Sequence, residues 1–433
     1  MGQTAMNVVS TGLMIAGAVV TGGMGAALIA AGVAVQFAAS QMYKPKPPGM
    51  GRDQSERKQL LRSSTAPETV IVGHTVVSGL LFFAEEEQGE QEEHEKITLA
   101  IALAGHPIER IGRIWLGDDP LESFGTVDKV TKVPLAGEIK TPVPVVEVEL
   151  HNGRTDPDPF MLANCPSWKP DMVGRDMAWL RVTLIFDPEK FPYGLPNIKC
   201  EVWGKKLYDP RTRQTRWSDN GALVILDYYR SYLQVPDADI DWVAFKRAAD
   251  ICEENIDTAD GGREPRYTLS GAYELDESPA GLLDAMHRCL SADPTYMAGQ
   301  HGILVGAYYG PAVQEIHENQ IIDTVTLTPE VGLKEATNAI YGTFVDAEQI
   351  YTKTDFTPVI QADWIAEDGL EIKEDIDFRF VTSPYQAQRL ARQHLRRKRA
   401  GRRAQLKMNL DGYAYRPGQV VRLNLPTLGI LCS

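Results

Sequence analysis

A chain of 433 residues has room for about three domains. Its net charge of −14 argues against general nucleic-acid binding, because phosphate contacts need a positive field. Five widely separated cysteines, with no CxxC pair, predict free thiols in a reducing cytoplasm rather than a disulfide framework.

The first segment is an uncharged arm. Residues 1–43 carry no charged side chain, and residues 11–39 are almost wholly small or aliphatic. The length suffices to cross a bilayer, whereas the missing basic n-region argues against a signal peptide. Small residues three or four apart let helices approach closely, which favours helical association over membrane contact or disorder. The packing candidates are Gly17, Gly22, Gly23, Ala26 and Ala27.

A proline-rich linker over residues 44–49 ends the arm, and the chain then becomes rich in strands. β-branched and aromatic runs, several alternating with polar residues, predict strands at 69–84, 97–104, 108–117, 143–150, 178–186 and 198–207. Turn signals such as Asn152-Gly153 separate them.

Helices are predicted further along the chain. A periodic run follows Asn220, and a second amphipathic helix covers Trp242–Ile256. Ser278 is the expected N-cap of a third helix, and Ser383 with Gln386 forms a capping box for a fourth. Further strands are expected at 302–309, 321–327, 405–410 and 419–425. The fold class is therefore β-rich α+β.

No motif makes a convincing active site. His317-Glu318 begins like a zinc-protease motif, but Ile321 stands where the second histidine must be. His287 and Cys289 diverge on a helix, which disfavours a metal site. We therefore expect no enzyme activity, catalytic residue, cofactor or metal.

Two clusters of like charge stand out. Seven glutamates in residues 85–95 lie between two strands, which favours a solvated hairpin tip over docking onto a basic partner. Basic residues from Arg389 to Arg403 must cover the outer face of the last helix, where we expect a partner surface. An acidic neighbouring subunit suits it better than DNA. The candidates are Arg389, Arg392, Arg396, Arg397 and Arg399.

Several stretches together resemble the central tail-hub protein of long-tailed bacteriophages, the J-type tip attachment protein of lambda-like phages. The most similar stretch is residues 203–229, WGKKLYDPRTRQTRWSDNGALVILDYY, with Gly221 where proline is commoner. The others are SSTAPETVIVGHTVVSG, HNGRTDPDPF, FPYGLPNI and VTSPYQAQRLARQHLRRKR. The resemblance covers most of residues 60–405.

This resemblance implies a homotrimeric hub that closes the distal end of the tail tube in the virion, after assembly in the host cytoplasm. Two barrel-like domains per chain would match a hexameric distal tail ring, and the hub would hold the tape-measure protein and open on attachment. The implied divisions are an arm and linker (1–48), a first barrel-like domain (49–235, with an insertion at about 117–175) and a helical segment with a second barrel-like domain (236–433).

The chain departs from this family at its end, where J-type proteins usually continue into receptor-binding regions. Separate fibres or other tail-tip proteins are therefore expected to carry host recognition. The arm would pack in the tube lumen or enter the host membrane. The alternative from another class is a membrane-anchored cell-wall hydrolase with residues 11–39 as its anchor. A hub of a contractile tail or secretion device ranks lower, because no spike-like repeat is present.

Overall fold

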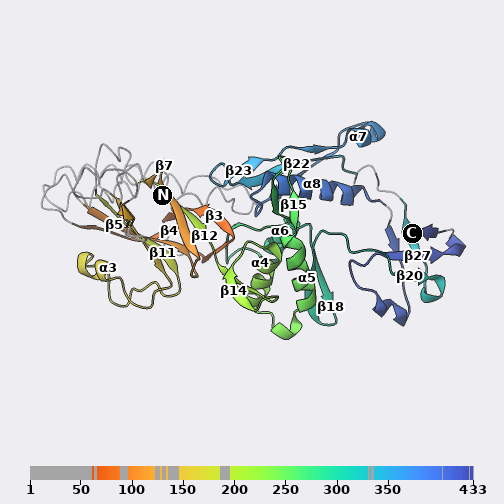
Figure 1. Cartoon of the computed structure of the whole chain (residues 1–433), viewed down its shortest axis with the longest axis horizontal. Helices are drawn as coiled ribbons and strands as arrows, with labels where there is room; N and C mark the ends of the chain where they lie inside the picture. Colours follow the sequence, from red (N-terminus) through yellow and green to blue (C-terminus); the bar gives the residue numbers. More distant parts are fainter. Residues whose placement is uncertain are drawn as a thin grey trace, which may run out of the picture.

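The structure is a computed structural model. It describes residues 61–62, 66–87, 96–121, 127–128, 133–134, 146–185, 196–329, 332, 336–401, 403–428 and 430–432. The predicted arm and its candidates Gly17, Gly22, Gly23, Ala26 and Ala27 lie outside these residues. The described part is elongated, with a strand-rich region at one side, a helical region in the middle and a small strand region near the C-terminus (Figure 1).

The strand-rich region consists of two sheets that enclose one core. The larger sheet has the order β1 (Leu61–Arg62), β4 (Leu80–Glu87), β5 (Lys96–Ala104), β11 (Ala178–Ile185), β10 (Val146–Asn152), β8 (Val127–Asp128), β9 (Val133–Pro134). The smaller has the order β3 (His74–Val77), β12 (Ile198–Trp203), β6 (Arg110–Leu116), β7 (Asp119–Pro120). The two sheets form a sandwich, because alternate side chains of both, such as Leu180 and Val202, meet in the core between them. This core is called the sandwich core below.

The strands predicted at 97–104, 108–117, 143–150, 178–186 and 198–207 form as β5, β6, β10, β11 and β12, with small shifts of their ends. Strands β4 and β5 pair antiparallel, and β4 ends in Glu85, Glu86 and Glu87. Within the described residues neither sheet closes into a barrel. Strand β10 lies inside the segment 117–175 expected as an insertion, yet it pairs with β11 along its whole length. The domain boundaries remain a prediction.

Strand β2 (Thr69–Val72) and its antiparallel partner β17 (Gly271–Glu274) form a wall between two cores. Because side chains alternate along a strand, Val70 and Val72 face the large central core while Ile71 faces the sandwich core. On β17, Ala272 faces the sandwich core and Tyr273 the central core. One short strand pair thus joins both hydrophobic units.

The single strand predicted at 69–84 is wrong, because the run divides into β2, β3 and β4 in three different sheets. Two glycines at positive φ make the breaks, Gly73 at +60° and Gly79 at +72°. A Cβ at Gly73 would lie 2.4 Å from the Leu269 carbonyl oxygen, so glycine is required there.

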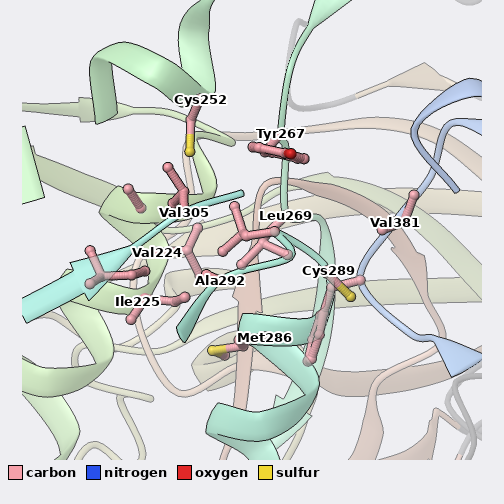
Figure 2. Packing of buried hydrophobic residues seen from close by; sticks show 14 of the residues in the cluster. Val224, Ile225, Cys252, Tyr267, Leu269, Met286, Cys289, Ala292, Val305 and Val381 are labelled. Carbon is pink, nitrogen blue, oxygen red and sulfur yellow. The ribbon is translucent and has the colours of Figure 1, made fainter. Parts of the chain in front are cut away.

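The central core is built by helices α4 (Gly221–Asp227), α5 (Trp242–Glu253), α6 (Pro279–Arg288) and α8 (Pro384–Arg399), with a π-helix at Tyr228–Tyr232. Figure 2 shows Cys252 of α5, Met286 of α6 and Tyr267 directed into this core. The predicted helices are present. However, α5 ends at Glu253, and Ile256 lies in strand β15 (Asn255–Asp257) instead.

Local capping explains two of these helix starts. Asn220 Oδ1 accepts from the amide of Ala222 at 3.1 Å, and Ser383 Oγ accepts from the amide of Gln386 at 3.3 Å. The expected capping box is only half formed, since Gln386 Nε2 donates to the carbonyls of Thr268 and Cys289. Burial of Gln386 against these carbonyls turns its side chain away from the helix start.

The remaining elements surround this body. Hairpins are formed by β13 (Lys206–Asp209) with β14 (Gln214–Trp217), β15 with β16 (Arg263–Pro265), and β18 (Asp293–Met297) with β19 (Gln300–Leu304). A mixed sheet holds β22 (Ala339–Asp346), β23 (Thr352–Asp355), β24 (Val359–Ile360) and β25 (Lys373–Phe378). A three-stranded sheet holds β20 (Gln314–His317), β27 (Val421–Leu425) and β28 (Ile430–Cys432), and β21 (Thr326–Thr328) pairs with β26 (Arg403–Gln405). Two further short helices are α3 (Pro159–Asn164) and α7 (Ala362–Asp368).

Of the strands expected late in the chain, 419–425 forms as β27 with its start at Val421, whereas the other three are displaced from their predicted positions. The run 302–309 begins earlier, as β19, and ends at Leu304. The run 321–327 is strand only from Thr326, and 405–410 is strand only up to Gln405. All of these strands are short, and the side chains of β21 and β26 are exposed, so hydrophobic alternation marks their ends poorly.

A second junction joins the sandwich to the mixed sheet. Tyr351 donates its hydroxyl to Nδ1 of His74 at 2.7 Å, while Nε2 of His74 donates to Glu201 at 2.9 Å. The imidazole also stacks on Trp203 at a centroid distance of 3.9 Å. Burial lowers the pKa of His74, so the neutral ring makes this junction at neutral pH.

His106 couples the stability of β2 to pH. Its Nε2 accepts from the amide of Ile71 at 3.0 Å, and its Nδ1 donates to the Pro107 carbonyl at 2.9 Å. Burial lowers the pKa of His106 from 6.5 to about 4. The unfolded chain therefore binds the proton more readily than the folded chain, and stability falls as pH drops below 6.5.

We expect this histidine to remove about 2 kcal/mol of the free energy of unfolding between about pH 7.5 and pH 5. Urea titrations at both pH values should show a loss in the wild type that exceeds the loss in His106→Gln by about 2 kcal/mol, because the buried His74 and His287 titrate in both proteins. The control His317→Gln, at an exposed site, should retain it. An equal pH dependence in His106→Gln would contradict the assignment.

Candidate partner surface

Helix α8 carries the predicted partner surface. Ser383 caps its start, Pro384 occupies its first turn, and Ala387, Leu390 and Leu395 are buried against the body. The basic side chains therefore project from the remaining faces of the helix. The structure divides the five arginine candidates into those bound within the chain and those left exposed.

Arg389 and Arg399 have partners within the chain. Arg389 donates to Glu264 of β16 at 2.5 Å and to the Arg266 carbonyl at 2.8 Å. Arg399 donates to Asp368 of α7 at 2.8 Å and lies over the Trp364 ring at 5.4 Å. Hydrogen bonds from Arg399 lower the pKa of Asp368. These two arginines hold neighbouring elements of their own chain.

The other candidates remain on the surface. Arg397 lies 3.3 Å from Asp293 and Lys398 lies 3.4 Å from Glu374, in pairs that are largely exposed and therefore contribute little stability. Arg392 and Arg396 are exposed, and within the described residues neither makes an ion pair. The surface available to a partner is therefore smaller than the sequence predicted.

A network of charged side chains is centred on the segment 203–229. The sequence pattern alone did not reveal this network. Asp209, 1% exposed, accepts from the amide of Arg211 at 2.9 Å and from its guanidinium at 2.9 and 3.0 Å. Arg211 also donates to Glu253 at 2.6 Å, and Asn220 donates to Glu253 at 3.2 Å. The network ties the β13–β14 hairpin to the start of α4 and the end of α5.

Burial opposes ionisation of Asp209, but hydrogen bonds and the charge of Arg211 outweigh it and lower the pKa of this carboxyl. Gly221 begins α4 beside the network, where a Cβ would lie 2.2 Å from Leu290 Cδ2. The Asp-Pro-Arg spacing at 209–211, typical of a turn closed by its own side chains, is the signal that could have indicated the network.

The HNGRTDPDPF loop covers the outer face of the large sheet with a second network. Asp158 lies 3.0 Å from His151 and 3.0 Å from Arg181, all three being buried. Burial opposes ionisation of Asp158, yet bonding to His151 and the charge of Arg181 lower its pKa to about 2. His151 stacks on Trp179 at 3.9 Å. These groups anchor α3 to the sheet.

The sequence offered two weak candidates for a metal or protease site, His287 with Cys289 and His317 with Glu318. In the described part of the chain, no group of three or more His, Cys, Asp or Glu side chains is placed to hold a metal ion. Four cysteines are buried free thiols there, namely Cys165, Cys200, Cys252 and Cys289. No helix among the described residues is long and apolar enough to span a bilayer.

The comparisons with known proteins concern phage-like particles. Residues 312–430, which include α8 and the C-terminal strands, match a family described as a putative phage tail protein. The fold is similar to a chain in the structure titled "Virion of native gene transfer agent (GTA) particle", with a TM-score of 0.54, 18% identity, and coverage of 94% of this chain and 92% of that one. No curated protein matches.

We expect Arg211→Ala to lower the free energy of unfolding by about 3 kcal/mol. It removes the guanidinium that donates to the buried Asp209 carboxylate and leaves this carboxylate with the exposed Arg216, 3.9 Å away. It should also raise the pKa of Asp209. The control Arg263→Ala removes an exposed pair with Asp257 and should change stability by about 0.5 kcal/mol or less. Urea denaturation measures both, and equal effects would contradict the network's role.

Proposed function

We propose that this chain is a structural phage-tail protein, the homotrimeric hub that closes the distal end of the tail tube. The observation that carries the proposal is the similarity of fold over 94% of the chain to a component of a gene transfer agent virion. The match of residues 312–430 to a putative phage tail protein supports it independently.

The described architecture suits such a part. Two sheet-built regions flank a helical body on one chain, so a trimer would present each region three times (Figure 1). Six related contacts could then meet a hexameric distal tail ring. Two of the five arginines that the sequence singled out, Arg389 and Arg399, bind within the chain, and the networks around Asp209 and Asp158 do the same. Such networks fix shape rather than perform chemistry.

In this proposal the three arms lie along the threefold axis of the trimer. Three copies of an uncharged segment with small residues at helical spacing would pack together in the tube lumen and contact the tape-measure protein. On host attachment the hub would open for DNA delivery, and the arm would meet the host membrane. Fibres or other tail-tip proteins would recognise the host.

Light scattering on the purified chain, with and without residues 1–48, tests the assembly. We expect a molar mass of three times 47.9 kDa for the full chain in detergent. Retention of the trimer after deletion would assign trimer contacts to the folded body, whereas its loss would assign them to the arm.

A peptidoglycan zymogram of the same preparation should show no lytic band. A monomeric chain with a lytic band would contradict the hub and support the membrane-anchored hydrolase instead.

A further inference from the structure

A cleft of about 420 Å³ is lined by residues of α6 and α8. Both helices lie in the middle of the molecule (Figure 1). Phe378 and Leu390, each 1% exposed, form the apolar floor of the cleft. Its rim is basic, with Arg288 at the end of α6, Arg397 and Lys398 on α8, and Arg403 on β26. The only acidic side chains on its wall within the described residues are Asp284 and Asp293.

The positive charge of the rim is only partly neutralised. Arg397 is engaged by Asp293 at 3.3 Å and Lys398 by Glu374 at 3.4 Å, through exposed pairs that water screens. Arg288 and Arg403 make no ion pair with any described residue. A basic rim on a chain of net charge −14 is therefore suited to bind carboxylates.

A buried histidine on the wall adds a second observation. His287, 5% exposed, donates from Nδ1 to the Leu283 carbonyl at 2.7 Å. Its Nε2 is buried and has no hydrogen-bond partner in the described part of the chain. Because Nδ1 carries the proton, Nε2 of the neutral ring is an acceptor, so it points to an occupant that brings a donor, such as a backbone or side-chain amide of a bound chain segment.

We propose that this cleft binds the glutamate-rich tip of a second copy of the chain. The tip, residues 85–95, holds Glu85, Glu86, Glu87, Glu90, Glu92, Glu93 and Glu95. Glu85 already accepts from Ser167, which follows α3 in the same chain, so we assign the contact to the glutamates from Glu90 onward. This inference rests on the proposed homotrimer and names one of its contacts.

The position of the two surfaces favours contact between copies. Strands β4 and β5, which lead to the tip, lie in the sandwich at the left of Figure 1, whereas α6 and α8 lie in the middle. Tip and cleft are different patches of one chain, so their contact is head-to-tail. A head-to-tail contact repeated around an axis closes a ring, as a trimer requires.

Charge reversal on the full-length chain in detergent tests the contact. One variant combines Arg288→Glu with Arg403→Glu, a second combines Glu90→Lys, Glu92→Lys and Glu93→Lys, and a third carries all five changes. Light scattering should show that each of the first two loses the trimer and that the third regains it, because reversal on both sides restores attraction. The matched control, Lys246→Glu with Arg263→Glu at exposed positions outside both the cleft and helix α8, should remain trimeric.

A trimer that persists in the cleft variant, or is not regained in the combined variant, would overturn this contact and leave the hub intact. A monomeric wild type would instead overturn the trimeric hub itself. A competition experiment on the wild-type chain does not depend on whether the variants fold. A peptide of residues 85–95 should dissociate the wild-type trimer, and the same peptide with glutamine in place of each glutamate should not. Equal effects of the two peptides would also overturn the contact.

Discussion

The wall formed by β2 and β17 is the constraint on which the described architecture depends. Val70, Ile71 and Val72 are at most 1% exposed and serve two cores from successive positions of one strand. A shift of register by one residue would exchange the side chains that face the two cores. The positive φ at Gly73 and the hydrogen bond from Ile71 to His106 hold this register. The sandwich and the helical body are thereby built as one unit.

Charge plays a different part inside this unit and on its surface. Within it, Asp209, Asp158 and their arginine partners join elements that are distant in the sequence, and their lowered pKa values show that the ionised forms fit these sites. On the surface, Arg397 and Lys398 of α8 make only weak exposed pairs, and Arg392 and Arg396 make no ion pair with any described residue. Charges left on a surface can steer association with a partner of opposite charge and select it.

The sequence predicted strands and helices well where hydrophobic periodicity was strong, as in β5, β11 and α6. The prediction failed at 69–84, because the hydrophobic pattern continues through Gly73. The reason for the turn there is the close approach of the Leu269 carbonyl to Gly73, which only the structure shows. The basic helix was located correctly, but the roles of Arg389 and Arg399 depend on Glu264 and Asp368, which are distant in the sequence. Pairing between such distant residues is set by the fold and leaves no local pattern. The buried Asp209 network escaped prediction for the same reason.

Cryo-electron microscopy of particles that carry this chain with a density tag would test the central claim most directly. A hub must lie at the distal end of the tail, with three copies related by a threefold axis. The account predicts three tag densities there and none along the tube. Sixfold density repeated along the tube, or particles with complete tails that lack the chain, would contradict it.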